Sequence, residues 1–284
     1  MIRRKLALLA AAFAGCLALA GCLISPGKFT SRLDLHRDGA FAFSYSGEIY
    51  LLALSKLATA GMTKDKPVFK AECVDEENFK PRPCSDEETA DQRKTWDANA
   101  SSREAETRRN SEAMRAMLGG IDPADPAAAD ELAARLRKQK GWRSVVNKGD
   151  GLFLVDYAIE GRLDHDFAFP AMERMQYANP FVAISLHQDG TVRVDAPAFS
   201  AASSTGNPFA ALAQMGALDK AGENGAGMPK MPQLDGRFTI VTDGEILANN
   251  TDEGPSAETS GKRLDWTITP RTAAAPTALV KLQR

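Results

Sequence analysis

The chain is poor in the residues that many functional classes require. Its 284 residues include three histidines and four cysteines, and aromatic residues make up 7% of the total. Lysine and arginine number 35 against 37 aspartate and glutamate residues, so the net charge of −2 lacks the basic excess of a nucleic-acid-binding surface. We therefore expect no nucleic-acid partner. The 44% of hydrophobic residues are nevertheless enough to bury a globular core.

Sequence motifs for common catalytic sites are also missing. The sequence has no Gly-x-Ser-x-Gly nucleophile elbow and no Ser-x-x-Lys box at a predicted helix start. It has no Gly-x-x-x-x-Gly-Lys phosphate loop and no dinucleotide-binding fingerprint. These absences predict a protein without a cofactor and without enzymatic activity.

The apolar run at residues 6–20 is too short to span a membrane comfortably. It has 15 residues, whereas a helix that crosses a bilayer needs about 20. The run follows the positive residues Arg3, Arg4 and Lys5, as the apolar region of an export signal does.

The run ends in Leu19-Ala20-Gly21-Cys22, which resembles the lipobox of bacterial lipoproteins. In that family a peptidase cuts before the cysteine, whose thiol carries lipid and whose amine is often acylated too. The resemblance implies a signal peptide at 1–21, lipidation of Cys22 and attachment to the periplasmic side of a membrane. Two or three acyl chains hold a protein far more firmly than one. An ordinary secretory signal is the alternative, and Cys16 ends a poorer competing box.

The residue after the lipobox bears on which membrane holds the protein. Leu23 stands where an aspartate would retain a lipoprotein in the inner membrane of enteric bacteria, so the resemblance favours the outer membrane. Residues 22–28 are then a lipidated tether, and residues 29–284 form a single domain.

Cys73 and Cys84 remain as an even pair in an oxidising compartment. The segment between them is polar and contains two prolines, so little else would hold it. We predict a disulfide that contributes roughly 2–3 kcal/mol. A metal or redox pair is the alternative, but the spacing is not Cys-x-x-Cys and no histidine lies nearby.

Alternating apolar residues around a glycine predict a β-hairpin at residues 29–45. Its turn would be Arg37-Asp38-Gly39, because glycine permits the positive φ that such turns need. Residues 33–43 align without gaps on residues 184–194, which have the same Leu-His-x-Asp-Gly pattern. Either this is an internal repeat or the same turn chemistry arose twice; we favour the second because Asp-Gly turns are common.

Residues 61–141 are predicted to be a polar helical insert. Just before it, residues 48–60 are predicted to form a short helix, although a strand stays open for the first of them. Residues 85–113 are so polar that their composition permits a solvated helix or disorder. Residues 125–141 are predicted to form a second helix, with Asp125-Pro126 at its start and an apolar stripe along one face.

After the insert the pattern is mostly that of strands, at 142–147, 151–162, 180–187, 191–196, 236–242, 263–269 and 278–283. Residues 200–233 interrupt it as a long loop or as an Ala-rich helix at 208–218. Strands from both ends of the sequence would thus surround a helical insert. The predicted fold class is α+β, with an antiparallel β-sheet core of hairpins.

The last part of the chain has a strand pattern at 238–246, then Asn249-Asn250, an acidic loop and a strand at 264–268. Together with the hairpin at 29–45, this order resembles envelope lipoprotein domains of the mycobacterial LppM type. It also resembles a set of alphaproteobacterial envelope lipoproteins. The resemblance implies a small β domain displayed on a membrane, in contact with lipid or glycolipid. The insert departs from the pattern, and no functional motif transfers.

One acidic region is a candidate for chemistry. On a strand, Asp164 and Asp166 would share one face and His165 would point away, which gives a carboxylate pair and not a His–Asp dyad. With Asp156 and Glu160 they form an acidic region at 156–166. A solvated strand edge is the simpler interpretation. A three-histidine metal site would need all three side chains to converge, which nothing in their spacing demands, so we predict no metal site.

These patterns favour a membrane-anchored periplasmic lipoprotein that is a non-catalytic binding or envelope-assembly module. Its partner besides the membrane would be a lipid, a glycolipid or an envelope protein, with the charged insert as a docking arm. A binding groove would be lined by apolar residues, for which the candidates are Phe167, Phe169, Phe181 and Phe199, although core packing explains each of them too. The alternative is a periplasmic hydrolase or metal-dependent enzyme that uses the 156–166 region.

Overall fold

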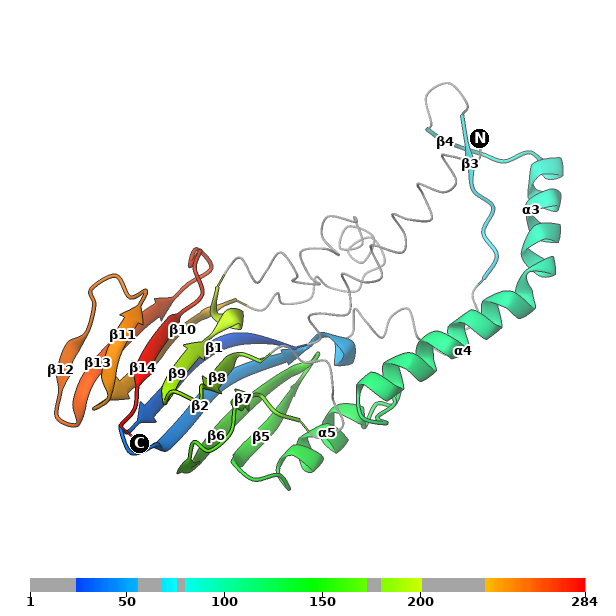
Figure 1. The fold of residues 1–284 in the computed structure, drawn as a ribbon. Coiled ribbons are helices and arrows are strands. Elements are labelled where there is room, and N and C mark those ends of the chain that lie inside the picture. Colours follow the sequence, from blue (N-terminus) through cyan, green and yellow to red (C-terminus); the bar gives the residue numbers. More distant parts are fainter. Residues whose placement is uncertain (1–23, 56–67, 76–79, 173–179, 201–232, 284) are drawn as a thin grey trace.

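The computed structural model describes residues 24–55, 68–75, 80–172, 180–200 and 233–283. In this part of the chain the fold is α+β, with three α-helices and three β-sheets, which confirms the predicted fold class. The helices are α3 (Asp86–Ala98), α4 (Ala100–Met117) and α5 (Ala128–Leu136). Figure 1 shows a layered β body from which α3 and α4 extend away.

The largest sheet has seven strands. In spatial order they are β12 (Ser256–Glu258), β13 (Gly261–Ile268), β10 (Asp235–Thr242), β1 (Ile24–Leu35), β2 (Ala40–Leu51), β6 (Leu152–Arg162) and β5 (Trp142–Gly149). Neighbouring strands are antiparallel except β1 and β10, which run parallel. The predicted antiparallel pairing is therefore correct except for this pair. Not every antiparallel pair is a hairpin, because β2 pairs with β6 and β10 with β13, which are not consecutive in sequence.

The second sheet has five antiparallel strands. In order they are β11 (Glu245–Asn249), β14 (Thr277–Lys281), β9 (Thr191–Asp195), β8 (Val182–Leu186) and β7 (Phe167–Phe169). A third, small sheet pairs β3 (Cys73–Val74) with β4 (Pro81–Arg82) inside the insert. The predicted stretch at 238–246 is not one strand, because its residues divide between β10 and β11 in different sheets.

The core lies between the two larger sheets. Alternate residues of β1 and β2 point into it, so Leu33, Phe43 and Tyr45 are at most 1% exposed. Tyr45 packs against Phe169 and Phe181 of the five-stranded sheet's side, with ring centroids 4.9 and 5.8 Å apart. At the β5 edge, α5 covers the same face with buried Leu132 and Leu136.

The strand β1 begins at Ile24, so the prediction of a tether at 22–28 is wrong for residues 24–28. Ser25 pairs with Tyr50 of β2, and Ile24 is 7% exposed. Pro26 and Gly27 are accommodated by a register shift between Pro26 and Phe29, where a bulge lets pairing continue.

The helix predicted at 48–60 is wrong where the structure describes it, and the strand left open for its first residues is correct. Residues 48–51 continue β2, and a 3₁₀ turn, η2 (Leu52–Leu54), follows. Helix propensity is overridden because Ile49 is paired on both sides, with Pro26 and with Phe153, and is 1% exposed.

The two Asp-Gly hairpins are built alike. In the β1–β2 turn the His36 N–H donates to Ala40 O (2.8 Å) and the Ala40 N–H to Asp38 Oδ1 (2.9 Å). In the β8–β9 turn His187 donates to Thr191 O (2.8 Å) and Thr191 to Asp189 Oδ1 (2.8 Å). The same turn chemistry explains why residues 33–43 and 184–194 have similar sequences, and no internal repeat is needed to account for it.

The α5 helix is shorter than the predicted range of 125–141. Asp125 and Pro126 lie in the turn before it, where Asp125 Oδ1 accepts from the Ala127 N–H at 2.8 Å. The helix ends at Leu136, and Gly141 follows with a φ of +92°. The predicted loop or Ala-rich helix at 200–233 lies almost entirely outside the described residues.

Candidate functional site

Helices α3 and α4 form an arm that leaves the β body (Figure 1). The described side chains of α3 include no buried residue, because the helix lacks an apolar stripe. Among its described side chains, the arm meets the core near its base, where Met114 packs against the core and Leu118, directly after α4, is 1% exposed. The helical alternative at 85–113 is therefore correct, although tertiary packing does not explain it.

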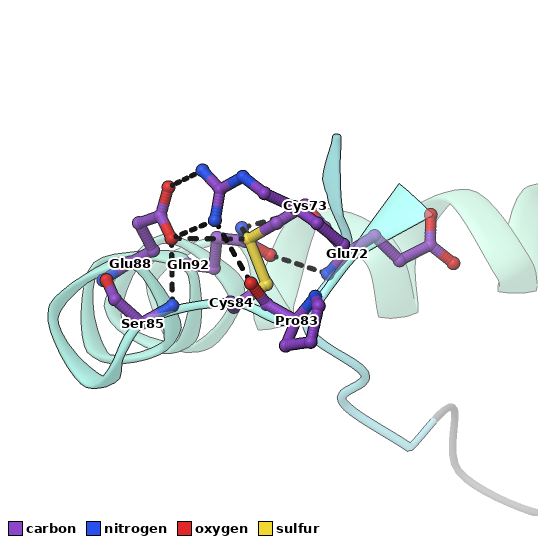
Figure 2. Close-up of a disulfide and its surroundings, with 8 residues drawn as sticks. Glu72, Cys73, Pro83, Cys84, Ser85, Glu88 and Gln92 are labelled. Carbon is purple, nitrogen blue, oxygen red and sulfur yellow. Dashed lines mark hydrogen bonds and ion pairs between the residues drawn. A yellow bond between two sulfur atoms is a disulfide. The ribbon is translucent and has the colours of Figure 1, made fainter. Parts of the chain in front are cut away.

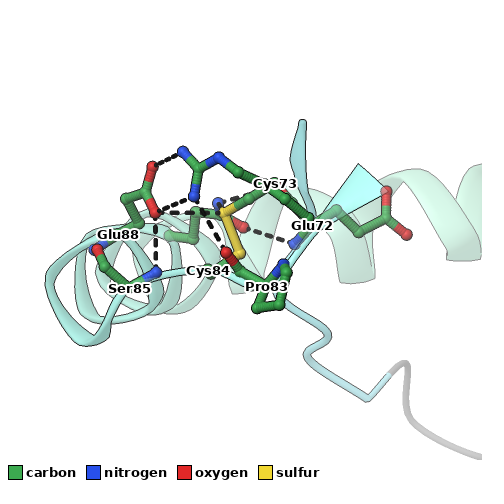
Figure 3. A network of polar contacts seen from close by, with 8 residues as sticks. Glu72, Cys73, Pro83, Cys84, Ser85 and Glu88 are labelled. Atoms are coloured by element: carbon green, nitrogen blue, oxygen red, sulfur yellow. Dashed lines mark hydrogen bonds and ion pairs between the residues drawn. A yellow bond between two sulfur atoms is a disulfide. The ribbon is translucent and has the colours of Figure 1, made fainter. Parts of the chain in front are cut away.

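Local contacts at the start of α3 replace that packing. The Glu88 N–H donates to Ser85 Oγ (3.2 Å), and the Ser85 N–H donates to Glu88 Oε2 (2.8 Å), which completes a capping box (Figure 3). Asp86 and Glu87 place further negative charge at the positive end of the helix dipole. The Ser-x-x-Glu spacing at 85–88 is visible in the sequence and could have indicated this helix start.

The structure contains the predicted disulfide. Cys73 of β3 and Cys84 lie with their Cα atoms 5.3 Å apart and close the β3–β4 hairpin directly before α3 (Figure 2). The bridge joins the hairpin to the helix start and so defines a compact unit at the end of the arm. We call residues 69–75 and 80–96 the head.

Glu88 is the centre of the polar contacts in the head. The Arg82 guanidinium donates to both of its carboxylate oxygens, at 2.5 and 2.9 Å. These bonds, followed by the bond from the Ser85 N–H, lower the pKa of Glu88 from 4.5 to about 2. The carboxylate thus joins β4 to α3 while it caps the helix.

Gln92 fixes the other strand of the hairpin. Its Oε1 accepts from the Glu72 N–H and its Nε2 donates to Glu72 O, both at 3.0 Å. This two-point contact holds the backbone before Cys73 along the side of α3 (Figure 2). The head is therefore ordered by its own side chains.

Aromatic and cationic side chains connect the head to the stem of the arm. Phe69 and Trp96 meet edge to face with ring centroids 6.0 Å apart. The Arg103 guanidinium lies 3.7 Å from the Trp96 ring centroid and donates to Trp96 O (2.6 Å), which spans the junction at Asn99 between α3 and α4. The spacing of these residues in the sequence did not predict this contact.

Charge is unevenly distributed along the arm. Between Glu72 and Asp91 the sequence has eight acidic and two basic residues, whereas residues 92–118 have four acidic and six basic residues. Residues 72–91, which we call the acidic segment, are therefore strongly acidic, and residues 92–118 are mildly basic. Such a surface attracts cationic groups and repels anionic ones.

The acidic region at 156–166 does not form one site. Asp164 and His165 lie in a bend after β6 and not on a strand, so the predicted sharing of faces is wrong: His165 Nδ1 contacts Asp164 Oδ1, both highly exposed. Asp166 instead accepts from the Leu186 N–H (2.9 Å). Glu160 lines a different place, a depression of about 530 Å³ on the outer face of the large sheet.

The histidines do not converge. His36 and His187 lie in the two separate hairpin turns, and His165 in the bend after β6. Among the described residues there is no group of three or more His, Cys, Asp and Glu side chains placed to hold a metal ion.

The phenylalanines predicted as a groove are core residues. Phe169, Phe181 and Phe199 are fully buried, and Phe167 is partly buried against Phe41 and Phe43. The hypothesis of an apolar groove at these side chains is therefore wrong, because the facing sheet fills the space.

Cys22 and the signal peptide lie outside the described residues, so their prediction stands as made. No described helix is both long and apolar enough to cross a bilayer.

Comparison with known proteins gives a low-scoring structural likeness. No protein-family model matches the chain, and no curated protein matches it. Among solved structures, the folded domain of the Mycobacterium tuberculosis LppM protein aligns with a TM-score of 0.29 and 11% identity, over 92% of this chain and 93% of that one. The likeness agrees with the predicted LppM-type resemblance only at this coarse level, and no residue role is transferred from it.

Proposed function

We propose that the chain is a membrane-anchored periplasmic lipoprotein that acts as a non-catalytic binding or envelope-assembly module. Its anchor is Cys22, and its docking element is the acidic segment at residues 72–91, which includes the start of α3. The observation that carries the proposal is the arm itself. Most helices in proteins are stabilised by packing an apolar face, whereas α3 buries no described side chain. It is held instead by the Ser85–Glu88 capping box, by the Cys73–Cys84 disulfide and by the two hydrogen bonds between Gln92 and Glu72, which we call the Gln92 clamp.

The charge of the acidic segment favours a protein partner with a basic surface. Anionic lipid headgroups attract basic segments and repel a segment with eight acidic and two basic residues. Complementary charge would speed encounter with a basic protein and make binding weaken as salt rises. Among the predicted partners, an envelope protein therefore fits the acidic segment better than a lipid or a glycolipid.

The anchor is tested with the variant Cys22→Ala. The acylated wild type is expected in the membrane fraction, and the variant is expected to be soluble in the periplasm, because the variant has no thiol to carry lipid. Cell fractionation with detection of the chain measures this. A variant that stays with the membrane would contradict the proposed anchor. Recovery of the variant in the soluble periplasmic fraction is the control that it was exported.

The docking role of the acidic segment is tested by neutralising charge without touching the contacts that order the head. Glu87→Gln with Asp91→Asn removes two exposed carboxylates of the head that take no part in the cap or the Gln92 clamp. Site-specific photocrosslinking in intact cells, from a crosslinker at Lys94, is expected to lose most of its partner product. The effect arises from charge, so added salt should reduce the wild-type product in the same way.

The matched control neutralises two exposed carboxylates of the stem, Glu104→Gln with Glu106→Gln. This variant carries the same change in net charge and is expected to keep the crosslink. Equal loss in both variants, or in neither, would contradict a docking role for the acidic segment.

A further inference from the structure

The seven-stranded sheet begins almost at the proposed anchor, on which this inference rests. A single residue separates Cys22 from Ile24, the first residue of β1. Three residues of extended chain reach at most about 11 Å, so the Cα of Cys22 lies within that distance of the Cα of Ser25. The sheet therefore cannot move away from the bilayer surface on a long tether, and the side chains near Ser25 are held at the lipid headgroups.

Register identifies these side chains. Ser25 is paired with Tyr50, Tyr50 with Leu152, and the next outward residue of β6, Leu154, with Val146 of β5. Directly paired residues share a face, and residues two apart on one strand share it too. Phe153 and Val155, between and beside these positions, are buried on the opposite face, so Tyr50, Val146, Leu152 and Leu154 lie together on the outer face. We call these four residues the anchor-side patch.

The anchor-side patch is apolar although it is open to solvent. Val146 is 44% exposed and Leu154 38% exposed, and they are two of the five exposed large hydrophobic residues in the described part of the chain. Neighbouring strands lie about 4.8 Å apart, which places Leu154 about 10 Å and Val146 about 14 Å across the sheet from β1. Tyrosine beside aliphatic residues is the composition typical of a water–membrane interface.

Charged groups border the patch without dividing it. The Lys148 side chain follows Val146 on β5 and is exposed, as is Lys28 on β1. The Glu48 carboxylate, opposite Leu154, accepts the Lys28 backbone N–H at 2.9 Å. Exposed lysines at the margin of an apolar patch suit contact with anionic headgroups.

The other end of the sheet has a different character. There the turns at Gly39 and Gly190 meet the C-terminal residues: Leu282 donates to Gly190 O (3.0 Å) and Gln283 to Arg37 O (2.9 Å). Figure 1 shows the C-terminus beside the far end of β1. The two ends therefore differ, and only the end with the patch adjoins the anchor.

We propose that the anchor-side patch, formed by Tyr50, Val146, Leu152 and Leu154, rests on the lipid bilayer that holds Cys22. The contact fixes one orientation of the β body, with the turns at Gly39 and Gly190 directed into the periplasm. Apolar burial at the patch adds to the affinity of the acyl chains because each exposed aliphatic group leaves water.

The test uses the full-length acylated protein in vesicles of phosphatidylethanolamine and phosphatidylglycerol. Because Cys22 is acylated and Cys73 is paired with Cys84, Val146→Cys offers a free thiol for an environment-sensitive fluorophore. A lipid that carries a quencher in its acyl chain is then mixed in. The label at position 146 is expected to shift to the blue and to lose most of its emission.

The matched control places the label at Leu247 of β11, an exposed leucine of the other sheet, where no quenching is expected. Leu154→Gln should also weaken quenching at position 146, whereas Leu247→Gln should not. Both leucines are already exposed, so these changes should leave thermal unfolding unaltered.

The possible outcomes distinguish failure of the proposed membrane contact of the patch from failure of the proposed lipid anchor at Cys22. If the protein floats with the vesicles but position 146 is quenched no more than position 247, the patch does not rest on lipid and the anchor still stands. If the label at position 146 is shielded even in soluble Cys22→Ala protein, a second copy or another protein covers the patch, which overturns the proposal. If the acylated chain does not float at all, both proposals fail.

Discussion

At the scale of single residues, Glu88 is the most heavily used side chain of the candidate site. It caps α3 through the Ser85 N–H and binds the Arg82 guanidinium, and these contacts lower its pKa to about 2. A carboxyl whose pKa is lower in the folded than in the unfolded state stabilises the fold above its unfolded value. Its contribution is therefore complete above about pH 4.5 and is lost as the pH falls toward 2.

Removing Arg82 should let the pKa of Glu88 return toward its ordinary value. In Arg82→Ala the pKa of Glu88 is expected to rise from about 2 toward 4.5, because the largest cause of the shift is gone while the bond from Ser85 is kept. NMR titration of the side-chain carboxyl carbon measures it, and the start of α3 should lose helicity at a correspondingly higher pH. Arg93→Ala is the control, since Arg93 pairs with Asp97 and not with Glu88. An unchanged titration in Arg82→Ala would contradict the assigned cause.

At the scale of elements, the arm shows how a helix can persist without a core. Composition at 85–113 left a solvated helix and disorder equally open, and the structure is helical because three contacts fix the first turns of α3. These contacts are the capping box of Ser85 and Glu88, the Cys73–Cys84 bridge and the Gln92 clamp. Each of them joins residues at most 20 apart in sequence.

Replacing both cysteines, Cys73→Ser with Cys84→Ser, should loosen the head and spare the β body. A closed loop of this length contributes about 2–3 kcal/mol, because the bridge limits the unfolded chain. Amide hydrogen exchange is expected to lose protection in β3, β4 and the first turns of α3. The strands β1, β2 and β6 are the internal control and should keep their exchange rates. Uniform loss of protection across the protein would contradict an independent head.

At the scale of the whole molecule, the two ends of the sequence depend on each other. β14, near the C-terminus, lies between β9 and β11, and its Val280 is fully buried. β1 lies between β2 and the parallel β10. The seven-stranded sheet is not complete until residues from both halves of the chain have come together, and the five-stranded sheet packs against it through contacts such as Tyr45 with Phe169, so we expect the β body to fold as one unit.

Truncation near the C-terminus should therefore prevent folding. Loss of residues 277–284 removes a central strand of the five-stranded sheet and exposes the strands on both sides of it. We expect no cooperative urea transition and a far-UV spectrum without the native strand signal. Loss of Gln283 and Arg284 alone keeps β14 and should leave the transition nearly unchanged. A cooperative transition in the longer truncation would show that the β body folds without β14.

The sequence by itself determined the local features. Period-two patterns located most long strands, Asp-Gly fixed two hairpin turns, and two remaining cysteines left one pairing. These features depend on residues a few positions apart, so no long-range contact is needed to read them. The resemblance of residues 19–22 to a lipobox is also local, and it stays a prediction.

Only the tertiary structure decided which strands are partners. It paired β1 in parallel with β10, extended β1 back to Ile24, and turned the predicted helix after Glu48 into strand. It also buried the candidate groove phenylalanines and gathered the anchor-side patch from β2, β5 and β6. The physical reason is that propensity and pattern act within a segment, whereas burial depends on the surface that a distant segment supplies.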